Sequence, residues 1–172
     1  MSIMSTTGAG RGALALARGQ IVETRARVTL GRRGIALLSQ APLFAGLSHR
    51  HLRRIADVAE EVRFAPDRLI VQAGSPGNTF YVIATGRAKV FKGVVPTGRP
   101  IAELDAGDFF GEMALLDGAL RSASVVSATD LVTIRLGRTA FRNLLLKEPE
   151  IALRVLETMA KRIRGHERSA TL

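Results

Sequence analysis

Glu112 and Arg121 are the residues of this sequence whose types and spacing point most clearly to binding chemistry. Glu112 is expected in the first turn of a short helix over residues 112–116, where unpaired backbone N–H groups and the positive end of the helix dipole point outward. Such a helix start favours an anion. Arg121 can bond a phosphate through two parallel N–H donors and stays charged at any cellular pH. The two residues together predict a site for a small charged ligand.

The acid in this pair restricts the kind of ligand. A carboxylate beside an arginine is a poor phosphate site by itself, because the acid repels the anion. The pair makes sense if Glu112 accepts a hydrogen bond from a ligand hydroxyl while Arg121 holds a phosphate, and a ribose cyclic phosphate with a free 2′-OH presents both groups. The hydroxyl and amide of Ser122 and the amide of Ala123 would add donors. The alternative is an internal salt bridge between Glu112 and Arg121 in a fold that has lost its ligand.

The elements that must position these residues are mostly short strands. From Val62 onward, apolar runs alternate with turn residues, a pattern typical of β-strands joined by tight turns. The predicted strands cover residues 69–71, 80–83, 88–91, 101–104, 124–126 and 131–136. Many short strands at nearly regular spacing indicate a sandwich or barrel.

Helical periodicity precedes and follows the strands. Ser48 is predicted to cap a first helix that runs through Leu52, Ile55 and Val58. The fold class is therefore α+β and mainly β. We expect an antiparallel, jelly-roll-like β-roll with an N-terminal helix, the short helix that begins at Glu112 and two C-terminal helices.

The two closing helices follow Gly137. Thr139 is predicted to cap the first of them, and Pro149 fits the first turn of the second. The second helix carries an apolar stripe, for which packing against the roll is predicted and a dimer seam is the alternative. The stripe consists of Ile151, Val155, Met159 and Ile163.

The segment around Glu112 resembles a known motif. Phe110-Gly111-Glu112-Met113-Ala114-Leu115 and Arg121-Ser122-Ala123-Ser124-Val125 are similar to the phosphate-binding cassette of the cyclic-nucleotide-binding domain family. The similarity is to the form found in catabolite regulators and protein kinase regulatory subunits, without the winged helix-turn-helix of the former. It extends over about residues 43–164 and includes Leu43-Phe44-Ala45-Gly46-Leu47 and Phe80-Tyr81-Val82-Ile83-Ala84-Thr85-Gly86.

The resemblance implies roles for individual residues. Glu112 would contact the ribose 2′-OH, Arg121 would pair with the exocyclic phosphate oxygens, and backbone amides would line the pocket. The implied ligand-binding residues are Gly111, Glu112, Met113, Ala114, Arg121, Ser122 and Ala123. No catalytic residue, metal ligand or cofactor is expected.

Two positions of the cassette depart from or refine the family pattern. Leu120 replaces a frequent proline before the arginine, a change that loosens the turn without removing a ligand contact. Family members that prefer cGMP often place threonine just after the arginine, where this chain has Ser122. We therefore expect cAMP as the ligand, with cGMP as the alternative.

Composition restricts the remaining classes. The 172 residues fit one domain, and the absence of cysteine excludes disulfides, thiolate zinc sites and cysteine nucleophiles. The formal net charge is +10, and six arginines against the single acid Glu23 fall in residues 1–33. We expect residues 1–33 to form a flexible basic extension, residues 34–168 the domain and residues 169–172 a tail. The alternative for the extension is an organelle transit peptide, which its low serine content disfavours.

The sequence thus predicts a cytoplasmic, non-enzymatic regulatory module that binds a cyclic mononucleotide and moves its C-terminal helices in signal transduction. The expected partners are an effector protein acting in trans and a second copy joined through the last helix. No apolar run is long enough to span a membrane. The alternatives are a ligand-free protein-interaction domain of the same fold and a nucleic-acid-binding regulator. Nucleic acid is disfavoured because the basic extension lacks interleaved aromatic residues.

Overall fold

The computed structural model describes residues 28–94, 96 and 98–170, and the expectations for residues 1–27 lie outside this part of the chain. In the described part, no helix combines the length and the apolar character needed to cross a membrane.

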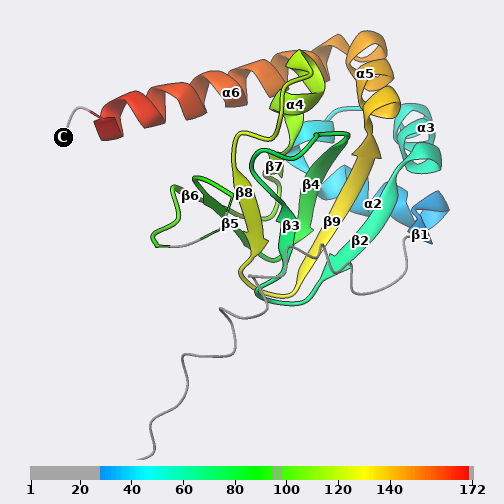
Figure 1. Cartoon of the computed structure of the whole chain (residues 1–172). Coiled ribbons are helices and arrows are strands. Elements are labelled where there is room, and N and C mark those ends of the chain that lie inside the picture. The colour runs from blue at the N-terminus through cyan, green and yellow to red at the C-terminus, as the bar shows by residue number, and fades with distance from the viewer. Residues whose placement is uncertain (1–27, 95, 97, 171–172) are drawn as a thin grey trace, which may run out of the picture.

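Two antiparallel sheets form the centre of the fold (Figure 1). Their strands are β1 (Val28–Thr29), β2 (Glu60–Phe64), β3 (Leu69–Val71), β4 (Thr79–Thr85), β5 (Ala88–Phe91), β6 (Ala102–Leu104), β7 (Phe109–Phe110), β8 (Ser124–Ser127) and β9 (Leu131–Gly137). One sheet has the order β1-β2-β9-β4-β7 and the other has the order β3-β8-β5-β6. The predicted strand runs and the β-roll are confirmed.

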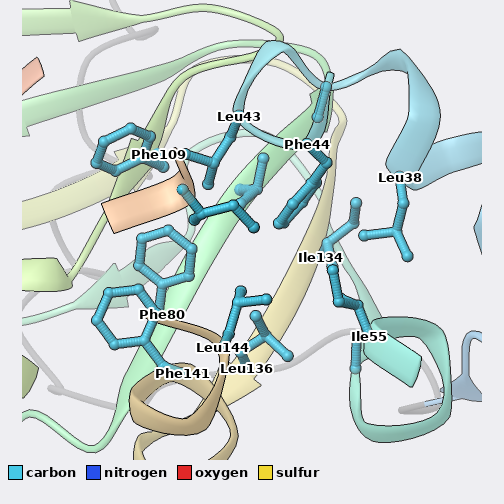
Figure 2. Close-up of a cluster of buried hydrophobic side chains, with 14 of the residues drawn as sticks. Leu38, Leu43, Phe44, Ile55, Phe80, Phe109, Ile134, Leu136, Phe141 and Leu144 are labelled. Carbon is cyan, nitrogen blue, oxygen red and sulfur yellow. The ribbon is translucent and has the colours of Figure 1, made fainter. Parts of the chain in front are cut away.

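Strand β4 connects two hydrophobic cores because its side chains alternate between the two faces of its sheet. Phe80 and Val82 belong to a cluster shared with the helices, where the rings of Phe80 and Phe141 stack with centroids 4.4 Å apart (Figure 2). Tyr81 and Ile83 belong to a second cluster, built from residues of both sheets. Because both faces of β4 are covered, the strand is a nearly continuous apolar run.

Helices and one 3-10 turn surround the first cluster, which we call the helix-side core. They are α2 (Gly31–Gln40), η1 (Pro42–Phe44), α3 (His49–Val58), α5 (Arg138–Lys147) and α6 (Pro149–Ala170), while the short α4 (Glu112–Asp117) lies between β7 and β8 in the sequence. Ser48 caps α3 as predicted, since its hydroxyl accepts a hydrogen bond from the backbone N–H of His51 at 3.3 Å. Leu52 and Ile55 are buried, whereas Val58, the last residue of α3, is 56% exposed.

The described secondary structure includes residues that precede the domain boundary expected at residue 34. Val28 and Thr29 pair with β2, and α2 begins at Gly31. Leu30 belongs to the helix-side core, and its backbone N–H donates to the carbonyl of Ala59 at 3.1 Å. The burial of this apolar residue anchors the segment to the fold, although the segment also contains Arg32 and Arg33.

The closing helices differ from the sequence prediction in two details. Helix α5 begins at Arg138 and its N-cap is Gly137 without a side-chain bond, so Thr139 lies inside the first turn and does not cap the helix. Helix α6 begins at Pro149 as predicted.

The apolar stripe of α6 is only partly packed. Ile151 and Val155 are buried and Met159 packs partly against them, but Ile163 is 58% exposed. The prediction that the whole stripe packs on the roll is wrong for Ile163, because the C-terminal part of α6 projects beyond the roll (Figure 1).

Candidate functional site

The turn between β7 and α4 depends on a glycine. Gly111 has a φ of 90°, which side chains disfavour, and it serves as the N-cap of α4. A Cβ at this position would lie 2.6 Å from the carbonyl oxygen of Thr79 and 2.6 Å from Nη1 of Arg121. The glycine therefore lets strand β4, the start of α4 and the Arg121 side chain meet at one place.

Glu112 is the first residue of α4 and is only 3% exposed. Its Oε1 forms an ion pair with Nη1 of Arg162 at 2.7 Å. Arg162 comes from α6, which passes α4 in Figure 1. Its other terminal nitrogen donates to the carbonyl of Phe109, and its guanidinium carbon lies 5.0 Å from the centroid of the Phe109 ring. One side chain thus fastens the last helix to the strand and the helix that carry the predicted site.

Arg121 is 7% exposed and is held by uncharged groups. Its Nη1 donates to the carbonyl of Gly111 at 3.1 Å. Its Nη2 donates to the carbonyl of Thr79 at 2.8 Å and to the hydroxyl of Thr79 at 2.9 Å. The backbone of Arg121 is also tied to the turn before β4, where its N–H donates to the carbonyl of Ser75 at 2.9 Å. The guanidinium is therefore oriented by groups of the protein itself.

The charge of Arg121 is not neutralised by a carboxylate in contact with it. Burial lowers the pKa of Arg121 from its ordinary value and the nearby Arg138 acts in the same direction, while Tyr81 and Glu112 oppose the shift. The ordinary pKa of arginine is so high that the side chain remains a cation. Among the described contacts, Glu112 pairs with Arg162 and Arg121 bonds to Thr79 and Gly111. The internal Glu112–Arg121 salt bridge, the alternative raised by the sequence, is not formed in this structure.

A second arginine fixes the turn before β4 against α4. Nη2 of Arg138 donates to the carbonyls of Gly77 at 2.9 Å and Ala114 at 3.2 Å. A Cβ at Gly77 would lie 2.3 Å from the Cβ of Ala114 and 3.1 Å from Nε of Arg121. The turn, the helix and the Arg121 side chain are consequently packed with no room for an added methyl group.

The family of the chain follows from this segment and from the strands around it. The family model described as "Cyclic nucleotide-binding domain" matches residues 61–148, just over half of the 172 residues, and this range includes Glu112 and Arg121. The chain belongs to the cyclic nucleotide-binding domain family.

Relatives of this cyclic nucleotide-binding domain include kinase regulatory subunits. The cAMP-dependent protein kinase regulatory subunit of Aspergillus fumigatus is 40% identical over 110 residues, which cover 64% of this chain and 26% of the relative. The chain thus spans about a quarter of the length of that curated relative.

Solved structures show the same fold. The regulatory domain of Toxoplasma gondii PKA, crystallised with cAMP, has a TM-score of 0.64 at 25% identity over 74% of this chain and 49% of that chain. The Thermus thermophilus catabolite activator protein has a TM-score of 0.66 at 28% identity over 77% of this chain and 62% of that chain. Both branches named from the sequence are thus confirmed as relatives.

The residues predicted to line the ligand site of this domain are unevenly exposed. Gly111, Glu112 and Arg121 gather at the start of α4, as described above. Met113 is 46% exposed, and its sulfur accepts a hydrogen bond from the exposed Ser122 hydroxyl at 3.8 Å. Ala114 is buried, and Ala123 is half-buried. Their backbone amides, rather than their side chains, are the groups that the resemblance assigns to the ligand.

Sequence reasoning missed Arg162, Arg138 and Thr79. Arg162 also lies outside residues 61–148, where the family model matches. Nothing in the local sequence distinguishes Arg162 from the neighbouring Lys161 and Arg164. Its partner, Glu112, lies 50 residues earlier in the chain. The described residues contain no group of His, Asp and Glu side chains arranged to hold a metal ion.

Proposed function

We propose that the chain is a regulatory module that binds a cyclic mononucleotide, cAMP in preference to cGMP, and performs no catalysis. The observation that carries the proposal is the state of Arg121, a cation that is 7% exposed and contacts only uncharged acceptors. Burying a charge without a counter-charge is costly, and an anionic ligand would offset that cost. A phosphate of the ligand is the natural counter-ion, because a guanidinium binds phosphate oxygens through charge-assisted hydrogen bonds.

In the proposed complex, the ribose and the phosphate bind to different side chains. Arg121 pairs with the exocyclic phosphate oxygens, and Glu112 accepts the hydrogen bond of the 2′-OH. Backbone N–H groups of Gly111, Met113, Ala114, Ser122 and Ala123 complete the pocket. Oε1 of Glu112 already pairs with Arg162, which leaves Oε2 for the ribose. The proposal involves no metal and no cofactor.

Binding would be transmitted through α6. Arg162 joins Glu112 to this helix, so a ligand that contacts Glu112 changes the free energy of the state in which α6 is docked. A ligand that binds the docked state more tightly shifts the population toward it. We propose that an effector protein in the cytoplasm, acting in trans, recognises this change.

Isothermal titration of the purified chain with cAMP, cGMP and 5′-AMP tests the proposal. We expect cAMP to bind at micromolar concentration or more tightly, cGMP more weakly and 5′-AMP much more weakly. Arg121→Ala should weaken cAMP binding about 100-fold or more, because removing one partner of a buried charged hydrogen-bonded pair costs about 2–5 kcal/mol. Arg142→Ala is the matched control, since Arg142 lies exposed on α5.

Three results would contradict the proposal. Unchanged cAMP affinity in Arg121→Ala would remove the site assignment. The absence of heat with every nucleotide would favour a ligand-free interaction domain of the same fold. Salt-dependent DNA binding that is lost on deleting residues 1–33 would favour the nucleic-acid alternative.

A second copy of the chain is the further partner that we propose. Leu153, Leu156 and Ile163 on α6 are 60%, 58% and 58% exposed. Together with the half-buried Ala160 they follow the three- and four-residue spacing of a coiled-coil seam. This face is different from the one on which Ile151 and Val155 pack against the roll.

A further inference from the structure

The Thr79 hydroxyl is a contact of Arg121 that the sequence did not predict. Thr79 is the first residue of β4 and is half-buried. It provides two acceptors to one nitrogen, because Nη2 of Arg121 donates both to its carbonyl at 2.8 Å and to its hydroxyl at 2.9 Å. With the 3.1 Å bond from Nη1 to the carbonyl of Gly111, these bonds fix both the position and the plane of the guanidinium.

We propose that Thr79 is a positioning residue for phosphate recognition, whose hydroxyl holds the Arg121 guanidinium in the orientation that receives the phosphate. The proposal rests on the proposed function and deepens it. Thr79 acts through Arg121, and no direct contact between Thr79 and the nucleotide is required.

The geometry explains why orientation at this position matters. An arginine side chain has several rotatable bonds, and bidentate phosphate binding needs its fork in one plane and one place. A guanidinium that is already held in place loses less conformational freedom when the ligand arrives. The supporting residue is also rigid, because threonine is β-branched and Thr79 begins the strand that both hydrophobic cores hold.

The chemical type of the support matters as well. A hydroxyl and a carbonyl orient the guanidinium without neutralising it, so the positive charge of Arg121 remains available to an anion. A carboxylate in contact with Arg121 would compensate the buried charge from within the protein. In this structure the nearby carboxylate, Glu112, is paired with Arg162.

The test compares Thr79→Val, Thr79→Ala and Thr79→Ser. Valine keeps the branched shape but replaces the hydroxyl by a methyl group. Alanine removes the hydroxyl and puts no group in its position. Serine keeps the hydroxyl. Thr85→Val is the matched control, because Thr85 is exposed at the opposite end of the same strand. Binding of cAMP is measured by isothermal titration and the melting temperature of each variant is recorded. Binding of adenosine, which lacks the phosphate, is followed by NMR chemical shifts because it is weaker.

We expect Thr79→Val and Thr79→Ala to lose cAMP affinity about tenfold, since one charge-assisted hydrogen bond is lost and the carbonyl bond remains. Thr79→Ser and Thr85→Val should stay within about threefold of the unmodified chain on the same grounds. Adenosine affinity should not change in any variant. If Thr79→Val does not fold, the loss of cAMP affinity is measured with Thr79→Ala.

Three results would overturn the inference. If the unmodified chain binds cAMP and Thr79→Val or Thr79→Ala binds it equally well, the role of Thr79 is contradicted while the proposed function stands. Equal losses for cAMP and adenosine would mean that Thr79 supports the fold rather than phosphate recognition. If the unmodified chain does not bind cAMP, the proposed function fails and this inference fails with it.

Discussion

At the scale of single residues, the candidate site contains three charged side chains, and its acid pairs with the arginine of α6 rather than with the buried Arg121. Glu112 pairs with Arg162 at 2.7 Å, while Arg121 is left with uncharged acceptors. This division of partners separates the two tasks of the proposed site. In the proposed complex, the second carboxylate oxygen of Glu112 accepts the hydroxyl and Arg121 receives the phosphate.

The Arg162 contact leads to a prediction about the ribose. Arg162→Ala should weaken cAMP binding about tenfold, because it leaves the buried Glu112 carboxylate without its partner and without a fixed orientation. The preference for cAMP over 2′-deoxy-cAMP should fall as well, since that preference depends on how Glu112 meets the 2′-OH. Titration of both nucleotides measures the two effects.

Arg164→Ala provides the control for Arg162→Ala, because Arg164 is exposed two residues further along α6. Tighter cAMP binding in Arg162→Ala would instead identify Arg162 as a competitor of the ribose. An unchanged ratio of cAMP to 2′-deoxy-cAMP affinity would disconnect Arg162 from the hydroxyl contact.

At the scale of elements, the turn before β4 and helix α4 approach each other closely beside the Arg121 side chain. Arg138 fixes this approach from the start of α5 by bonding to the carbonyls of Gly77 and Ala114. The same arginine therefore connects the predicted site with the closing helices.

Gly77→Ala tests whether this close approach is required. The added Cβ would lie 2.3 Å from the Cβ of Ala114, so α4 or the turn must move. We expect the free energy of unfolding to fall by about 1–3 kcal/mol, as in other overpacked sites. cAMP affinity should fall too, because Nε of Arg121 lies next to the added methyl group. Chemical denaturation and titration measure the two quantities.

Gly137→Ala is the matched control for Gly77→Ala. A Cβ at Gly137 meets no atom within 4 Å, and its φ of −71° suits any residue. The control should cost less than about 1 kcal/mol, since alanine is only a poorer N-cap than glycine. Equal effects of the two substitutions would contradict the importance of the close approach.

The sequence predicted the elements better than the contacts between them. Apolar runs between turn residues marked the strands, and Ser48 and Pro149 marked two helix starts, because each of these signals is local. Glu112 and Arg121 were singled out as site candidates for the same reason, since one short segment contains both. Thr79, Arg138 and Arg162 were missed because their partners are distant in sequence, and a local pattern does not say which surface side chain bridges such a distance.

At the scale of the whole molecule, helix α6 has two apolar faces and only one of them is covered. Ile151 and Val155 pack into the helix-side core, while Leu153, Leu156 and Ile163 face outward. Exposed apolar residues that follow a heptad spacing are typical of a helix that pairs with a second helix.

We therefore expect the chain to self-associate through α6. Sedimentation analysis at micromolar concentration should show a dimer, and Leu156→Glu should shift it to monomer because a charge would be buried at the seam. Leu146→Glu is the control, since Leu146 lies on α5 and is 78% exposed. A monomer at all concentrations, or equal effects of both substitutions, would contradict this interface.

The ion pair between Glu112 and Arg162 also dictates an order of events during synthesis. A ribosome adds about 5–20 residues per second, and domains begin to fold while the chain is still growing. The Arg121–Thr79 contact uses only residues that are synthesised before α6, which begins at Pro149. Both partners of this contact are thus present in the growing chain before Arg162, and Glu112 can receive its ion-pair partner only after Arg162 has been synthesised.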